Sequence, residues 1–131
     1  MDNDERIRVI DAQHHELFDI FTEIQSKREG IDRLYVEGAL DKLAEYVHKH
    51  LTFEERFMAG LGFPELEGHV REHESIRHRI ADTREKLAVD SPAEWVGAIL
   101  VQLAAYLEQW LKEHILSTDM RYRKFLRTGE R

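Results

Sequence analysis

The stretch that decides the fold runs from Tyr46 to Met58 and reads YVHKHLTFEERFM. Through it and just before it, apolar residues recur at alternating spacings of three and four, the pattern of an amphipathic helix; they are Val36, Leu40, Leu43, Val47 and Phe57. His50 and Glu54 lie on the same face, so an imidazole and a carboxylate point toward the core. A buried carboxylate is costly unless it is paired or binds a metal. The rest of the chain must therefore supply partners for Glu54.

Composition indicates an ordinary soluble protein. The chain has 131 residues, of which 42% are hydrophobic and 34% charged, and we expect residues 1–131 to form one domain with a hydrophobic core. The net charge of -7 argues against nucleic acid as a partner. Because the chain has no Cys, disulfides, thiolate metal sites and Cys nucleophiles are excluded.

Nothing in the sequence predicts membrane association. No apolar run approaches the roughly 20 residues of a membrane span, and the charged N-terminus MDNDERIRVI lacks the apolar core of a signal peptide. We therefore expect a cytoplasmic protein that acts as a monomer, with room for an unidentified protein partner.

The apolar periodicity predicts four helices joined by short links, which favours an all-α, up-down-up-down four-helix bundle. The first helix is predicted at about 8–27, with Gly30 as its C-cap. The second begins at an Asp32 N-cap and ends at about residue 59, and the third follows Pro64. Residues 91–94, Ser-Pro-Ala-Glu, form a capping box that opens the fourth helix.

Each predicted helix places histidine on its buried face: His14 in the first, His50 in the second, His69 and His73 in the third, and His114 in the fourth. A lone buried histidine is usually a hydrogen-bonded core residue. Five of them converging on a carboxylate would leave many polar groups unsatisfied in a core without metal. The pattern therefore predicts a metal centre inside the bundle.

Asp119 completes the set only if the fourth helix changes. It follows His114 by five residues, which is about 140° around an ideal α-helix, so we infer that the helix ends or distorts near Ser117 and Thr118. Five imidazoles and two carboxylates are too many ligands for one zinc ion and suit two ions of higher coordination number, although the spacing does not choose the metal. The Glu-x-x-His motif of ferritin-like di-iron proteins occurs once, at Glu45, away from the buried face.

Other polar residues are interpreted as ordinary surface or core residues. His15, His48 and His78 lie off the apolar faces and are expected to face solvent. Glu55 is expected at the surface or behind a ligand. Tyr46 and Tyr106 are expected to pack in the core, with hydroxyls that could reach a ligand imidazole.

Several motifs together resemble one known family. They are IDAQH ending at His14, HLTFEE starting at His50, HVREH from His69 to His73, and HILSTD from His114 to Asp119, together with Met58 and the Phe63-Pro64 pair. In these motifs, and over most of its length, the chain resembles a bacterial hemerythrin.

The resemblance implies a di-iron site that cycles between Fe2+ and Fe3+, has a bridging oxo or hydroxo group, and takes dioxygen as a ligand. It implies that one iron is bound by three imidazoles, the other by two, and both by two bridging carboxylates; these are His69, His73 and His114, then His14 and His50, then Glu54 and Asp119. By the same analogy the dioxygen pocket is lined by Leu17, Leu51, Trp110 and Ile115. Leu51 stands where the family usually has Phe, so a larger or more accessible pocket is expected.

The function that this resemblance implies is reversible dioxygen binding for carriage, storage or delivery, without catalytic residues. Two alternatives use the same centre. One is a dioxygen or redox sensor whose state is read by a partner protein, and the other is di-iron catalysis on peroxide or nitric oxide. We rank catalysis lower because the sequence offers no acid–base pair beyond the predicted ligands.

Overall fold

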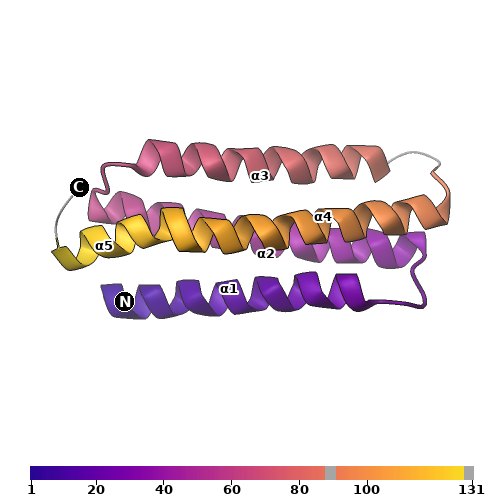
Figure 1. Ribbon diagram of the computed structural model, residues 1–131, viewed down its shortest axis with the longest axis horizontal. Coiled ribbons are helices and arrows are strands. Elements are labelled where there is room, and N and C mark those ends of the chain that lie inside the picture. Colours follow the sequence, from indigo (N-terminus) through magenta and orange to yellow (C-terminus); the bar gives the residue numbers. More distant parts are fainter. Residues whose placement is uncertain (88–90, 129–131) are drawn as a thin grey trace.

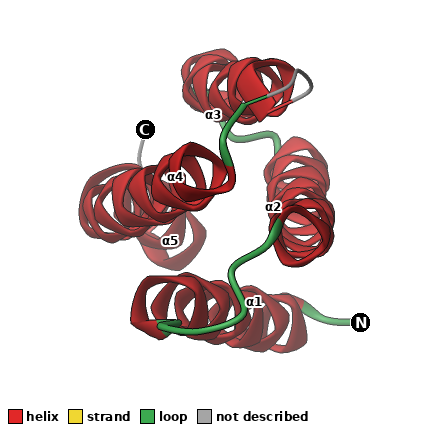
Figure 2. Ribbon diagram, turned by 90° about the vertical axis from the view of Figure 1, so that its right-hand side faces the viewer, coloured by secondary structure: helices red, strands yellow, loops and turns green. Residues whose placement is uncertain are grey.

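Four long helices lie side by side along the molecule in the computed structural model, which describes residues 1–87 and 91–128 (Figure 1). They are α1 (Asn3–Ser26), α2 (Arg33–Leu61), α3 (Leu66–Leu87) and α4 (Ala93–His114). A short π-helix, η1 (Ile115–Asp119), continues α4 and leads into α5 (Met120–Thr128). Seen along the bundle, α1 lies opposite α3 and α2 opposite α4 (Figure 2). The predicted all-α, up-down-up-down bundle is confirmed.

Local capping explains where α1 and α2 begin and end. Asp2 accepts a hydrogen bond from the Glu5 N–H at 2.8 Å, so α1 starts earlier than its apolar pattern predicts. Asp32 caps α2 as predicted and accepts from the Tyr35 N–H at 2.8 Å. At the other end of α2, Gly62 has φ 67° and donates to the Ala59 carbonyl at 3.1 Å, a left-handed helix end that glycine adopts without steric cost.

Two capping predictions were wrong. Gly30 has a positive φ of 69°, but it lies in the link, because the chain already leaves α1 in an extended conformation at Lys27. The capping box at residues 91–94 is also absent. Pro92 occupies the N-cap instead of the first helical position, and within the described residues no side chain caps α4.

The core consists of two apolar clusters with a polar layer between them. The larger cluster includes Leu17 of α1 and Leu51 of α2, and the smaller includes Ile10 and Phe57 of the same helices. Along α1, His14 lies between Ile10 and Leu17. Along α2, Glu54 lies between Leu51 and Phe57, so both polar residues fall in the layer between the clusters. The smaller cluster also contains the fully buried Tyr122, so the C-terminal segment docks on the bundle through α5.

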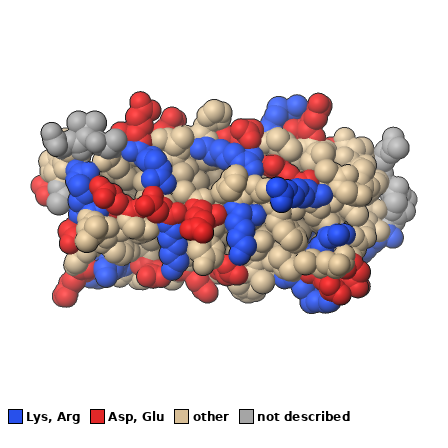
Figure 3. Space-filling view, turned by 180° about the vertical axis from the view of Figure 1, so that it is seen from behind, with Lys and Arg blue, Asp and Glu red and all other residues tan. Residues whose placement is uncertain are grey.

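The outer surface is strongly charged. On the face opposite that of Figure 1, Lys and Arg alternate with Asp and Glu over the length of the bundle (Figure 3). Among the described residues, no helix is both long and apolar enough to cross a membrane.

The packing of α2 can be tested with a matched pair of substitutions. Leu43 is 0% exposed and Leu34, on the same helix, is 79% exposed. We expect Leu43→Ala to lower the free energy of unfolding by about 2–5 kcal/mol, because it leaves a cavity between the helices, and Leu34→Ala to change it by less than about 0.5 kcal/mol. Urea unfolding at equal metal loading measures both, and equal effects would contradict the assignment of this face to the core.

Candidate metal centre

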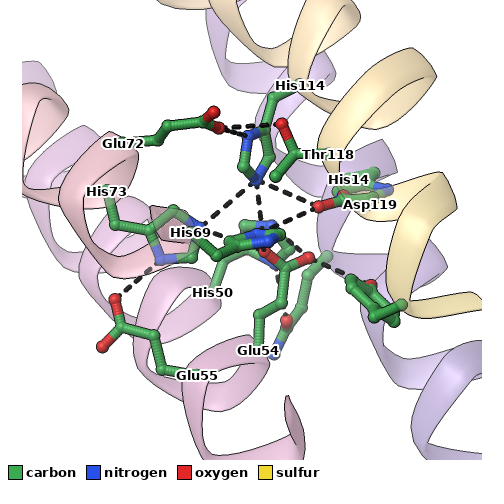
Figure 4. A network of polar contacts seen from close by, with 12 residues as sticks. His14, His50, Glu54, Glu55, His69, Glu72, His73, His114, Thr118 and Asp119 are labelled. Atoms are coloured by element: carbon green, nitrogen blue, oxygen red, sulfur yellow. Dashed lines mark hydrogen bonds and ion pairs between the residues drawn. The ribbon is translucent and has the colours of Figure 1, made fainter. Parts of the chain in front are cut away.

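All seven side chains predicted as ligands are buried in the polar layer of the bundle. They come from every long helix and from η1, and Figure 4 shows them pointing toward one another. The other three histidines, His15, His48 and His78, are exposed as predicted. The structure therefore brings the whole predicted set together.

One half of the cluster gathers around a single carboxylate oxygen. Glu54 Oε1 lies 2.7 Å from His69 Nε2, 3.0 Å from His73 Nε2 and 3.3 Å from His114 Nε2. The four side chains each offer a ligand atom, and these atoms all lie within 4.8 Å of one another. This spacing fits one metal ion held by three imidazoles and a carboxylate.

The other half shares that carboxylate. His14, His50 and Glu54 form a second group of ligand atoms within 4.8 Å of one another, with Glu54 Oε2 lying 3.9 Å from His50 Nε2. Asp119 joins the halves from the opposite side. Its Oδ1 lies 3.0 Å from His114 Nε2, and its Oδ2 lies 3.4 Å from His14 Nε2. Both carboxylates thus lie between the two groups of imidazoles.

The distortion predicted for the fourth helix is present. Residues Ile115–Asp119 form a π turn, which accommodates one more residue than an α turn. The extra residue moves Asp119 onto the face of His114, and Asp119 is fully buried there. The inference that the helix distorts near Ser117 and Thr118 is confirmed.

Outer hydrogen bonds fix how three of the imidazoles face the centre. The Nδ1–H of His50 donates to Gln13 Oε1 at 2.9 Å, and that of His73 donates to Glu55 Oε2 at 2.7 Å. The Nδ1–H of His114 donates to Glu72 Oε2 at 3.1 Å. A proton held on Nδ1 leaves the Nε2 lone pair free to bind a cation. The expected place of Glu55 behind a ligand is confirmed, and Arg77 holds it there at 2.9 Å.

Sequence reasoning missed several of these supporting residues. No supporting role was assigned to Gln13, Glu72, Thr118 or Tyr122. The Tyr122 hydroxyl donates to Glu54 Oε2 at 3.1 Å, and its position three residues after Asp119 was a signal that both face the core. The prediction for Tyr106 was wrong, because its ring is 39% exposed and lies under the Arg79 guanidinium at 4.1 Å. Tyr46 is half-buried against the larger cluster.

The carboxylates control the charge of the imidazoles in the metal-free cluster. Burial disfavours charged His114, but Asp119 at 3.0 Å and Glu54 at 3.3 Å outweigh it and raise the pKa of His114 to about 10. Burial prevails at His50 and lowers its pKa to about 4. Burial and the charge of Glu54 oppose ionisation of Asp119, yet the surrounding imidazoles lower its pKa to about 2. Ionised carboxylates are thus balanced by protons, which metal ions would replace.

Unpaired polar atoms supply the test of whether a metal fits. His14 Nε2, His50 Nε2 and both carboxylate oxygens of Asp119 are buried and have no hydrogen-bond partner among the described residues. Their neighbours are close, as the distances above show, but they do not have hydrogen-bond geometry. Buried polar groups left in this way are costly. Metal cations would satisfy them, and an imidazole and carboxylate donor set suits first-row ions.

A small apolar cavity lies beside His50. The centre of a water molecule could occupy about 10 Å³ of this cavity, which is room for about one water molecule. Its walls are Leu17, Phe21, Val47, His50, Leu51, Ile76, Leu107, Trp110 and Leu111. Three of the four residues predicted to line a pocket are among them. Ile115 is not, because Leu107 and Leu111 form the wall from this helix while Ile115 packs half-buried against the larger cluster. The expectation that Leu51 makes this pocket larger or more accessible than Phe would stays a prediction.

Comparison with known proteins gives a consistent result. The family described as "Hemerythrin HHE cation binding domain" matches residues 5–126. The chain is similar to a bacteriohemerythrin of Pseudomonas aeruginosa, with 27% identity over 116 residues covering 88% of this chain and 72% of the relative. It is also similar to bacteriohemerythrins of Clostridium acetobutylicum, at 28% identity and covering 86% and 88%, and of Campylobacter jejuni, at 26% identity and covering 95% and 88%. No solved structure matches the chain significantly.

Removal of the shared carboxylate should abolish the paired site. Glu54→Ala leaves imidazoles without the group that lies between them, so we expect fewer than one Fe2+ per chain after anaerobic loading and desalting. Glu45→Ala is the matched control, because Glu45 is exposed on the same helix, and it should bind as much Fe2+ as the parent. Unchanged metal content in Glu54→Ala would show that this carboxylate does not bridge.

The metal-free protein should lose stability in alkali through His114. Folding raises its pKa from 6.5 to about 10, so its contribution to the free energy of unfolding is complete below about pH 6.5 and is lost as pH rises through about 10. The opposite sign holds for Asp119, whose lowered pKa contributes above about pH 4 and is lost as pH falls through about 2. Urea midpoints should therefore fall between pH 6.5 and 10, and less steeply in His114→Gln. Parallel pH curves for parent and variant would refute this assignment.

Proposed function

The chain belongs to the hemerythrin family of HHE cation binding domains, as the resemblance predicted, and from this premise we propose that it is a non-heme di-iron protein that binds dioxygen reversibly. One iron would be held by three imidazoles, the other by two, and both by two carboxylates; these are His69, His73 and His114, then His14 and His50, then Glu54 and Asp119. When bound, the iron pair supplies the two electrons that dioxygen takes up. The unequal number of imidazoles would leave the ion beside His14 and His50 with one protein ligand fewer.

The observation that carries this proposal is the cavity beside His50. It adjoins the half of the cluster with fewer ligands, it has room for about one small molecule, and apart from His50 its walls are apolar side chains. A neutral diatomic molecule needs no charged partner and is well matched to such walls. Water and anions are disfavoured there because the cavity offers them few hydrogen bonds.

The surrounding side chains have roles that do not depend on the ligand. Gln13, Glu55 and Glu72 keep the outer nitrogens protonated, which holds the inner nitrogens toward the centre. The hydroxyl of Tyr122 holds Glu54 from the smaller cluster. Burial raises the pKa of Tyr122, so its hydroxyl stays protonated and continues to donate at neutral pH.

The same cavity supports binding over catalysis. Cleavage of the peroxide O–O bond and reduction of nitric oxide both require proton transfer, and a positioned acid normally delivers the protons. Among the described residues, His50 is the one titratable side chain that lines the cavity, and it is a proposed ligand whose Nδ1–H is already held by Gln13. We therefore propose a non-enzymatic role in the carriage, storage or delivery of dioxygen.

Absorption spectroscopy tests the proposed function. The iron-loaded, reduced protein should gain visible absorption on exposure to dioxygen and lose it again when dioxygen is removed under argon, over repeated cycles. Glu45→Ala should behave like the parent. Irreversible oxidation in the first cycle would contradict reversible binding, and rapid consumption of added peroxide or nitric oxide would favour the catalytic alternative.

Access to the cavity should depend on the size of residue 51. Leu51 is buried in the cavity wall, so Leu51→Ala should enlarge the cavity and make azide binding to the oxidised, iron-loaded protein several-fold faster. Leu51→Phe should slow it, with a packing cost of about 1–3 kcal/mol. Leu43→Ala is the control for general destabilisation, because it removes a similar buried side chain farther along α2. Stopped-flow rates that are equal in all four proteins would exclude Leu51 as a gate.

A further inference from the structure

We propose that Glu72 and Thr118 are positioning residues that hold the π turn of η1 in register, so that His114 and Asp119 face the same metal pair. This inference rests on the proposed di-metal centre, and it gives roles to two side chains that are not ligands. The positions of the two ligands His114 and Asp119 pose a geometric difficulty. His114 and Asp119 are both needed at one point, but a continuous α-helix would place them about 140° apart.

The π turn solves that difficulty only while its extra residue stays in place. π-Helices are rare, occur mostly as single turns within α-helices, and are frequently found at functional sites. If this one relaxed to an α turn, every residue after it would rotate by about 100° around the helix axis. Asp119 would then leave the centre, and Tyr122 would leave Glu54. Something outside the helix must therefore favour the π register.

Glu72 of α3 makes contacts on both sides of that turn. Its Oε2 accepts a hydrogen bond from the Thr118 hydroxyl at 2.8 Å and another from the His114 Nδ1–H at 3.1 Å. One oxygen thus joins the residue that precedes the π turn to a residue near its end (Figure 4). Relaxation to the α register would rotate Thr118 relative to His114, and we expect this rotation to weaken one of the two bonds, so that the pair of bonds favours the π register.

Other helical hydroxyls show that the hydrogen bond from Thr118 to Glu72 is unusual. Helical Ser and Thr usually donate to the carbonyl one turn earlier. Ser117 does so, to Glu113 at 2.7 Å, and Thr83 of α3 does so, to Arg79 at 2.8 Å. Thr118 instead donates across the bundle to another helix, although its side chain is as buried as that of Thr83.

Glu72 is positioned to link two proposed ligands, His114 and Asp119, through the π turn that separates them. It lies between His69 and His73 on α3, and its own side chain is 46% exposed, so it is outside the cluster. Glu55 supports one histidine and is itself held by Arg77. Glu72 supports a histidine and a backbone register at once. Loss of Glu72 should therefore change the coordination geometry of the metal site as well as its metal affinity.

Cobalt binding tests this proposal, because the visible spectrum of Co2+ reports its coordination geometry. Thr118→Val removes the hydroxyl and keeps the shape, Thr118→Ser restores the hydroxyl, and Thr83→Val is the control for loss of a buried hydroxyl. Supporting hydrogen bonds of this kind are typically worth 10–100-fold in metal affinity. We expect Thr118→Val and Glu72→Ala to weaken binding of one Co2+ by about that factor and to alter its spectrum. Thr118→Ser and Thr83→Val should match the parent.

The double variant Thr118→Val with Glu72→Ala should bind Co2+ no more weakly than Glu72→Ala alone, since both changes release the same turn. Affinities and spectra of Thr118→Val that equal those of the parent would overturn the proposal. So would full additivity in the double variant.

Hydrogen exchange provides a readout that needs no metal and separates this proposal from the proposed function. In the metal-free protein, amides of residues 115–119 should exchange at least several-fold faster in Thr118→Val and Glu72→Ala than in the parent or in Thr83→Val. Exchange at parental rates would show that the pair does not hold the turn, even if two metal ions bind. Faster exchange in these two variants, together with a parent chain that binds no metal pair, would support the positioning role and refute the di-metal centre.

Discussion

The structure depends on the burial of two carboxylates, Glu54 and Asp119, inside a helical bundle. Neither retains contact with solvent, and the ion pairs that they make within the described residues are with histidines, not with lysine or arginine. Five imidazoles surround them instead. Such a layer is stable only when cations or protons occupy it, so the requirement for compensating positive charge is built into the packing of the chain.

The remaining architecture holds that layer in place. One apolar cluster closes it on each side, and each of the four long helices contributes at least one imidazole. Outer acceptors direct three of the imidazoles inward, and the π turn corrects the one helix whose regular geometry would misplace a ligand. The apolar wall beside His50 then leaves a small space next to the half of the cluster with fewer ligands. The proposed binding of dioxygen therefore depends on the protein ligands that are present and also on the one that is missing beside His14 and His50.

Much of this could be predicted from residue spacing. Apolar periodicity was sufficient to predict the bundle, and histidines on its four apolar faces were sufficient to predict a metal centre, whereas Asp119 could be included only by requiring a distorted helix. The start of α1 was missed because Asp2 caps a charged segment that carries little apolar periodicity. Gln13 and Glu72 could not be recognised, because a polar residue next to a ligand looks like a surface residue until the neighbouring helix is placed against it. Ile115 was placed in the pocket by analogy, whereas the wall on this side is formed by Leu107 and Leu111.

The central claim is that one buried cluster holds two iron ions between shared carboxylates. Anomalous diffraction at the iron edge, from crystals of the iron-loaded protein, tests it most directly. The account predicts two peaks in each chain, one beside His69, His73 and His114 and the other beside His14 and His50, both in contact with Glu54 and Asp119. A single peak, or peaks that lie away from either carboxylate, would contradict it.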